Sequence, residues 1–139
     1  MSNKIAVLAH NNLKPKLVTF LKEREQWFWG RELVATGRTA ELLKENLSLS
    51  IHGVKPGNEG GFRDLSQMVT EGAVKCVIFL RAPEIIPDYE DEVTEFVKAC
   101  NRANLPLATN PASAELLILG LIKKESAELT KSRTQANTH

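Results

Sequence analysis

Two apolar runs, the second broken only by Lys75, restrict the folds open to this chain more than any other feature. Residues 5–9 read Ile-Ala-Val-Leu-Ala, and residues 74–80 read Val-Lys-Cys-Val-Ile-Phe-Leu. A strand without polar alternation is buried on both faces, and such strands belong to parallel sheets that helices cover. We therefore expect a parallel sheet with a helical layer on each side.

Weaker strand signals and helical patterns alternate along the rest of the chain. Three further strands are expected over residues 33–35, 47–54 and 105–108. Apolar residues recur between them at spacings of three and four, which gives a helix one apolar face. The expected helices are 13–27, 39–45 capped by Thr39, 65–71 ending at Gly72, 88–103, and one from Asn110-Pro111 through Ile122. This alternation predicts the α/β class, as a three-layer sandwich with a mostly parallel five-stranded sheet.

Length and charge restrict the organisation and the partners. A chain of 139 residues fits one domain, 1–123, and the sequence turns polar afterwards, so residues 124–139 are expected to form a C-terminal tail. The net charge of +1 gives no long-range field for nucleic acid or an anionic membrane. Cys76 and Cys100 lie in apolar patterns and are expected to be buried thiols, with a disulfide as the alternative. No signal peptide is recognised, so a cytoplasmic location is expected.

Candidate anion-binding groups follow the second and third expected strands. Ligands of open α/β sheets bind beyond the carboxyl ends of the strands. The segment Thr36-Gly37-Arg38-Thr39 places hydroxyls, a glycine and a cation at the start of a helix, where free N–H groups favour an anion. Residues 56–61 contain three glycines, which let a backbone approach a ligand closely. An ordinary turn and a flexible loop are the alternatives.

Four other residues are candidates for the site, and each also has an ordinary structural explanation. His10 directly follows the first strand, where it could polarise a carbonyl or simply form a structural hydrogen bond. Lys14 lies one helical turn further on and is otherwise a solvated lysine. Asp88 and Asp91 suit a helix N-terminus as ordinary capping carboxylates. No cluster has the spacing of a metal site, and neither a metal nor a cofactor is expected.

Four collinear motifs resemble the methylglyoxal synthase family over nearly the whole chain up to about Ile122. The opening strand with His10 and Lys14 resembles that family's Ala-His-Asp-x-x-Lys, and residues 35–40 resemble its Ala-Thr-Gly-Thr-Thr-Gly. Residues 56–61 resemble its Ser-Gly-Pro-x-Gly-Gly, and residues 104–114 its Asn-Ile-Pro-x-Ala-Thr-Asn-x-Ala-Ser-Ala. The resemblance implies a Rossmann-like fold and a homohexamer. It also implies a site that converts dihydroxyacetone phosphate to methylglyoxal and phosphate.

The resemblance also assigns roles to residues. His10 matches the group that polarises the carbonyl, and Asp91 matches a site aspartate. The expected phosphate and substrate site comprises Lys14, Thr36, Gly37, Arg38, Thr39, Gly57, Gly60 and Gly61. The bound partner is expected to be a phosphorylated small molecule or inorganic phosphate.

Two departures from the family motifs concern catalysis. The family's carboxylate base follows the double glycine, where this chain has Phe62, and a second family aspartate is Ala82 here. A phenylalanine cannot accept a proton, and a general base typically contributes about 10²–10⁴-fold to a rate. Asp64, two residues past the base position, or Glu59 could substitute.

Three functions remain open on the sequence. The first is a phosphometabolite-binding domain with eroded catalysis and a sensing or regulatory role. The second is an active methylglyoxal synthase with a relocated carboxylate such as Asp64. The third is a partner-binding protein whose pocket is vestigial.

Overall fold

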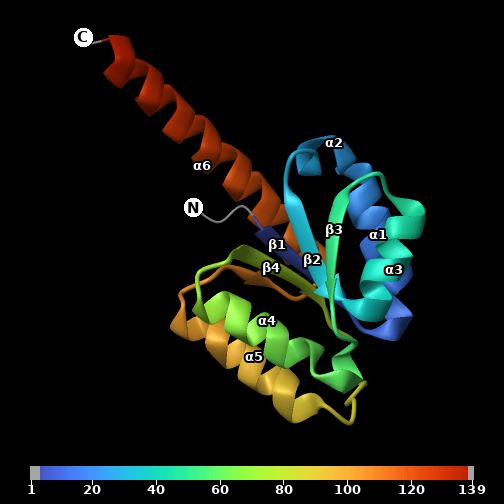
Figure 1. Cartoon of the computed structure of the whole chain (residues 1–139). Helices are drawn as coiled ribbons and strands as arrows, with labels where there is room; N and C mark the ends of the chain where they lie inside the picture. Colours follow the sequence, from blue (N-terminus) through green and yellow to red (C-terminus); the bar gives the residue numbers. More distant parts are fainter. Residues whose placement is uncertain (1–3, 138–139) are drawn as a thin grey trace.

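A five-stranded parallel sheet in the order β3-β2-β1-β4-β5 forms the centre of the molecule (Figure 1). The computed structural model describes the backbone of residues 4–137 and the side chains of residues 4–131. The strands are β1 (Lys4–Ala9), β2 (Glu32–Thr36), β3 (Ser50–Val54), β4 (Val74–Leu80) and β5 (Leu107–Ala108). The helices are α1 (Lys14–Glu23), α2 (Glu25–Phe28), α3 (Gly37–Asn46), α4 (Gly61–Thr70), α5 (Glu90–Arg102) and α6 (Pro111–Asn137), with short 3₁₀ turns at Asn11–Leu13 and Gly57–Glu59.

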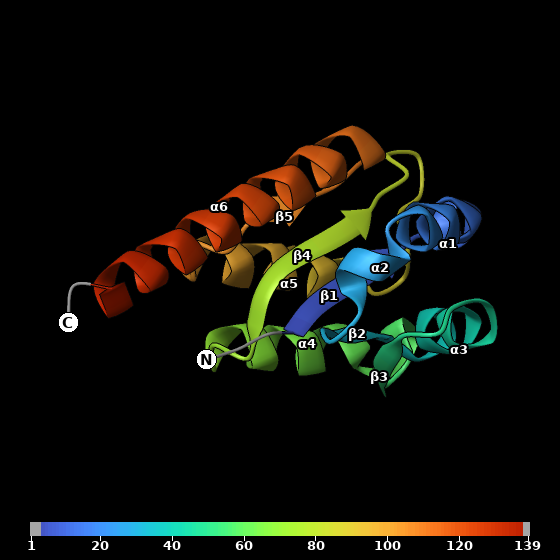
Figure 2. The ribbon, with the colours of Figure 1, turned by 90° about the horizontal axis from the view of Figure 1, so that it is seen from above.

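Every neighbouring pair of strands is parallel, and helices cover both faces of the sheet (Figures 1 and 2). Side chains of α1, α2, α3 and α6 share one apolar core with the sheet, and side chains of α4 and α5 share the other. The central strand β1 is buried from Ile5 to Leu8 because it lies between these two layers. The expected α/β class and parallel five-stranded sheet are confirmed.

The first two crossover helices differ from the sequence pattern at their ends. The expected helix 13–27 divides at Arg24, which leaves the helical conformation with φ −120° and ψ 21°. The Arg24 guanidinium instead lies 4.0 Å from the centre of the Phe20 ring and donates to the Phe20 carbonyl at 3.1 Å. Thr39 is not the cap of its helix, so that prediction is wrong. Strand β2 turns directly into α3 at Thr36, and this places Thr39 in the first turn, 1% exposed.

The later helices follow their capping signals closely. Helix α4 begins at Gly61, earlier than expected, and ends just before Gly72, whose φ of +76° is the left-handed conformation that stops a helix. The Asn110 side chain accepts a hydrogen bond from the Ser113 N–H at 2.8 Å, so Asn110 caps α6 as expected. Cys76 and Cys100 are buried free thiols, also as expected.

Helix α6 runs far beyond its expected end at Ile122 and projects past the edge of the sheet (Figures 1 and 2). Glu125 fastens it to the body through Arg31 at 2.6 Å and Lys75 at 3.1 Å. The division into a domain, 1–123, and a tail, 124–139, stays a prediction, and the helix crosses that boundary unbroken. Within residues 4–137, no helix is both long enough and apolar enough to span a bilayer.

Candidate functional site

A cleft of about 150 Å³ opens at the carboxyl edge of the sheet, over the ends of β1, β2 and β4. This is the edge at which open α/β sheets bind their ligands. The lining residues are Ala9, His10, Asn11, Lys14, Thr36, Arg38, Thr39, Pro56, Gly57, Asn58, Phe62, Phe79 and Tyr89. None of these residues is an aspartate or a glutamate.

His10 is held as a neutral imidazole with one free nitrogen. The backbone N–H of Ala82 donates to its Nδ1 at 2.8 Å, so Nδ1 carries no proton and the neutral ring bears its hydrogen on Nε2. Nε2 is buried and has no partner within the described part of the chain. Burial lowers the pKa of His10, and the charge of Arg81 lowers it further, against an opposing effect of Glu90. His10 is therefore an uncharged hydrogen-bond donor at the cleft.

Two cations share the cleft. Lys14 enters from the first turn of α1, and Arg38 enters from the first turn of α3. Burial lowers the pKa of Lys14, and the nearby charge of Arg38 lowers it further. Because no lining residue is a carboxylate, these charges are left for a bound anion to neutralise.

The N-terminus of α3 adds donors to the same wall. Its first turn contains no acidic side chain, and no side chain caps its free N–H groups. Such an end attracts anions through those N–H groups and through the helix dipole. Thr36 and Thr39 lie beside it with their residues 9% and 1% exposed, and Gly57 closes the wall from the loop after β3. This wall has the composition of a phosphate site.

The opposite wall is aromatic. Phe62 packs with its ring centre 5.5 Å from Phe79, 5.7 Å from Tyr89 and 5.7 Å from Phe96. Phe62 is 4% exposed and belongs to the apolar core under α4 and α5. The His10 ring meets Phe79 edge-on, with centres 5.4 Å apart. This wall offers hydrocarbon surface and, apart from the Tyr89 hydroxyl, no proton-transfer group.

The structure brings together one part of the site expected from the sequence. His10, Lys14, Thr36, Arg38, Thr39 and Gly57 all line the cleft. Asp64 and Asp91 do not line it. Asp64 is partly buried in the first turn of α4, and Asp91 is exposed in the first turn of α5. Glu59, the other candidate carboxylate, is exposed and also lies outside the lining.

Three expected glycines shape the surrounding loops instead of lining the cleft. The Gly37 N–H donates to the Lys55 carbonyl at 3.3 Å, which fixes the start of α3 against the loop after β3. Gly60 has a φ of +97° before α4. A Cβ at Gly61 would lie only 2.0 Å from the Lys55 carbonyl oxygen, so no larger residue fits there without moving the backbone. A direct contact of these glycines with a ligand stays a prediction.

Tyr89 is a lining residue that the sequence analysis did not assign to the site. It lies between β4 and α5, stacks on Phe62, and stands so close to Gly57 that a Cβ there would be 3.1 Å from its ring. Burial raises the pKa of the Tyr89 phenol, while Arg38 acts in the opposite direction. The only sequence signal for a place in the site was its position between a strand end and the next helix. An aromatic ring by itself indicates core packing.

Among the residues that the structure describes, no group of three or more His, Cys, Asp or Glu side chains is arranged to hold a metal ion. The polar groups that the cleft offers to a ligand include a neutral histidine, two cations, hydroxyls and backbone N–H groups.

Comparisons with known proteins point in one direction. The chain is 37% identical over 118 residues to the methylglyoxal synthase of Carboxydothermus hydrogenoformans, covering 85% of this chain and 98% of that protein. It is 37% identical over 121 residues to the methylglyoxal synthase of Exiguobacterium sibiricum, covering 87% and 84%. The crystal structure of methylglyoxal synthase from Elizabethkingia anophelis superposes with a TM-score of 0.77 at 28% identity, over 84% of this chain and 76% of that one. No protein-family model matches the chain.

Proposed function

The chain belongs to the methylglyoxal synthase family, and from this premise we propose that it binds a phosphorylated three-carbon metabolite or phosphate and acts as a sensor or regulator. In this proposal the synthase reaction is weakened. The observation that carries it is the composition of the cleft, which combines two cations and a neutral histidine with no lining carboxylate.

Phosphate binding is supported by the wall that Lys14, Arg38 and the N-terminus of α3 form. A guanidinium can bind two phosphate oxygens at once, and an ammonium supplies a point charge. Thr36 and Thr39 add hydroxyl donors, and Gly57 allows close approach of its loop. The groups needed to fix a phosphate are therefore present on separate elements that meet in one place.

The proton-transfer half of the reaction is where we propose a loss. The synthase reaction removes a carbon-bound proton from dihydroxyacetone phosphate, and the resulting enediolate then expels phosphate. We place Phe62 at the position of the family's catalytic aspartate because it directly follows the paired glycines Gly60 and Gly61. Its buried ring cannot accept the proton, and Ala82 offers no second carboxylate.

A retained synthase activity is the second candidate. His10 lines the cleft and its Nε2 has no partner among the described residues, so in this candidate function its N–H would polarise the bound carbonyl. A loop movement that brings Asp64 into the cleft would then supply the base. Asp91 is proposed as a site carboxylate on the same terms, since neither lines the cleft as it stands.

Assembly and location complete the proposal. A homo-oligomer, a hexamer in particular, is expected from the resemblance and remains a proposal for this chain, as does a cytoplasmic location. No cofactor is assigned.

The test is methylglyoxal formation from dihydroxyacetone phosphate by the purified protein, with Asp64→Asn as the control. The sensor proposal expects no turnover and a melting temperature that rises saturably with dihydroxyacetone phosphate and with inorganic phosphate. Turnover that disappears in Asp64→Asn overturns it in favour of an enzyme with a displaced base. Neither turnover nor stabilisation overturns both and leaves a vestigial pocket.

A further inference from the structure

The outer face of α6 carries an unusual amount of exposed hydrocarbon. Six large apolar side chains are exposed in the described part of the chain, and four of them belong to this helix. These four are Leu116, Leu119, Ile122 and Leu129, with exposed fractions from 39% to 70%. Exposed apolar residues gathered on one element mark an interaction surface, whereas single ones are ordinary.

The periodicity of α6 places this surface beside its buried face. Ala114 and Ile118 are buried against the sheet, and Leu117 and Leu121 pack partly on the same core. The exposed residues recur at steps of three, three and seven: Leu116 and Leu119 lie away from the buried face, whereas Ile122 and Leu129 lie one and three turns from buried Ile118 and border it. Helix α6 therefore has one face committed to the fold and an apolar outer stripe, Leu116 to Leu129, without a partner in the described chain.

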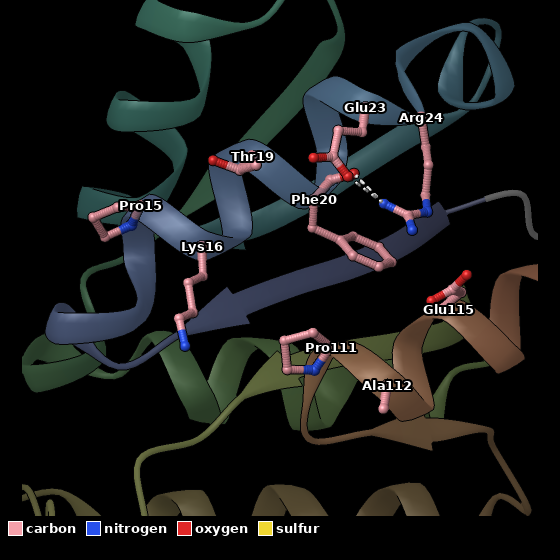
Figure 3. Close-up of a pocket in the computed structure, with 9 residues that line it drawn as sticks. All are labelled: Pro15, Lys16, Thr19, Phe20, Glu23, Arg24, Pro111, Ala112 and Glu115. Atoms are coloured by element: carbon pink, nitrogen blue, oxygen red, sulfur yellow. Dashed lines mark hydrogen bonds and ion pairs between the residues drawn. The ribbon is translucent and has the colours of Figure 1, made fainter.

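An apolar groove of about 460 Å³ adjoins the stripe. It lies between α1 and the first turn of α6, and Figure 3 shows Phe20, Pro15 and Pro111 bordering it. Charged side chains form its rim, namely Lys16, Glu23, Arg24 and Glu115. The groove is thus a recess beside the N-terminal end of α6, while Leu129 is a projecting apolar side chain near the other end.

We propose that the outer stripe and the groove are the two halves of one self-complementary interface, in which a second copy of this chain packs its α6 antiparallel on α6. A two-fold axis beside Leu119 sets Leu116 against the partner's Ile122. The same axis brings the partner's Leu129 to the first turn of α6, next to Pro111 and the groove. Each copy then fills the recess of the other, as a two-fold interface requires.

Charge complementarity favours a second copy of the chain as the partner and an antiparallel direction for its α6. Glu115 and Lys123 are exposed, flank Leu119 at equal distances along the helix, and form no ion pair within the described residues. In the antiparallel arrangement Glu115 meets the partner's Lys123, and the pair occurs twice. A parallel arrangement would place like charges together, which is unfavourable. The inference does not depend on the proposed ligand and adds a contact surface to the proposed assembly.

The first test is the molar mass of the full chain by sedimentation or light scattering. Leu119→Glu places a carboxylate on the two-fold axis and is expected to halve the mass of the assembly. Thr94→Glu, which places the same carboxylate at an exposed position of α5 in the opposite helical layer, is expected to leave it unchanged. A monomeric wild-type protein, or an unchanged mass in Leu119→Glu, overturns the proposal.

Two further variants fix the geometry. Glu115→Lys and Lys123→Glu are each expected to shift the assembly toward the smaller species, and the double variant is expected to restore the wild-type mass. Leu119→Cys is expected to form a disulfide-linked dimer under mild oxidation, because the axis brings the two thiols together while Cys76 and Cys100 are buried. No cross-link, or no recovery in the double variant, overturns the antiparallel arrangement.

Ligand titrations on the same variants separate this inference from the proposed function. Phosphate affinity that persists in Leu119→Glu together with a halved mass supports both proposals. If the wild-type protein assembles but does not bind phosphate, only the proposed function is overturned. If the wild-type protein binds phosphate as a monomer, only the proposed interface is overturned.

Discussion

The two walls of the cleft differ in what holds them in place. Lys14, Arg38 and the N-terminus of α3 form a wall whose charges have no carboxylate partner among the lining residues. Phe62, Phe79 and Tyr89 form a wall of rings packed against one another and against the core under α4 and α5. The first wall therefore gains from binding an anion, while the second contributes to folding whether or not a ligand is present.

This difference indicates that binding and proton transfer are separable in this cleft. The cationic wall gains favourable interactions only when an anion arrives, so replacing its groups should change affinity more than stability. In the proposed function the aromatic wall occupies the region from which a base would act, so changing it should alter stability and chemistry together. Four variants or conditions test that separation.

Introducing a carboxylate into the aromatic wall is the most direct challenge. Phe62→Asp is expected to raise the rate of methylglyoxal formation by about 10²-fold, the low end of what a positioned general base contributes. The apolar surroundings should raise the pKa of the new carboxyl and make it a better base. The matched control is Phe62→Asn, which has a similar size but no base. Equal rates in the two variants would show that other absent groups limit the reaction.

Removing the Phe62 ring measures its role in packing. Phe62→Ala is expected to lower the free energy of unfolding by about 3–5 kcal/mol, the range for a buried phenylalanine that leaves a cavity. Urea denaturation measures the loss, and Trp29→Ala, at a residue 58% exposed, serves as the control with a change within about 0.5 kcal/mol. A Phe62→Ala value close to that of the control would mean that the ring cluster is not part of the stabilising core.

Weakening the cationic wall should affect affinity. Arg38→Ala is expected to weaken phosphate binding by about 1–3 kcal/mol, the scale of a hydrogen bond to a charged group, with little loss of stability. Calorimetric titration measures this, and Lys16→Ala on the exposed side of α1 is the control. Unchanged affinity in Arg38→Ala would remove Arg38 from the site.

The pH dependence of stability tests the neutral state of His10. Burial is the larger cause that lowers the pKa of His10 below the ordinary 6.5, and the charge of Arg81 is the next. The unfolded chain therefore binds the proton more readily than the folded chain. The contribution of neutral His10 to the free energy of unfolding is complete above pH 6.5, and it is lost as the pH falls through the lowered pKa of the folded state. Urea denaturation at a series of acidic pH values should show a smaller decline for His10→Gln than for the wild-type protein. Identical declines would contradict a buried neutral histidine.

The sequence predicted the sheet well because burial on both faces leaves a mark in consecutive residues. The run from Ile5 to Ala9 is apolar whichever way each side chain points, so neither periodicity nor turn chemistry was needed. Thr39 shows where such reasoning fails. Its hydroxyl suits a helix cap, but the helix had already begun at Gly37, whose N–H bonds the distant Lys55 carbonyl.

The binding half of the site was more predictable than the rest. His10, Lys14, Arg38 and the threonines directly follow strands, and strand ends of a parallel sheet converge at one edge. The place of Tyr89 in the cleft and the length of α6 depend on contacts between residues that are far apart in sequence. Tyr89 lines the cleft because it stacks on Phe62, and Glu125 docks through Arg31, which lies 94 residues away. A local pattern does not contain such contacts.

The convergence of three strand ends has a consequence for how the chain reaches its native pairing. Thr36 pairs with Val54 across β2 and β3, and Ala6 pairs with Val34 across β1 and β2. A slip of one residue in either ladder would move half of the anion wall by about 3.3 Å and turn its side chains to the opposite face. In the proposed function, an anion at about 100 times its dissociation constant would stabilise the correctly registered sheet by about 2.7 kcal/mol and a slipped sheet by little. Phosphate in a refolding buffer is therefore expected to select among strand alignments.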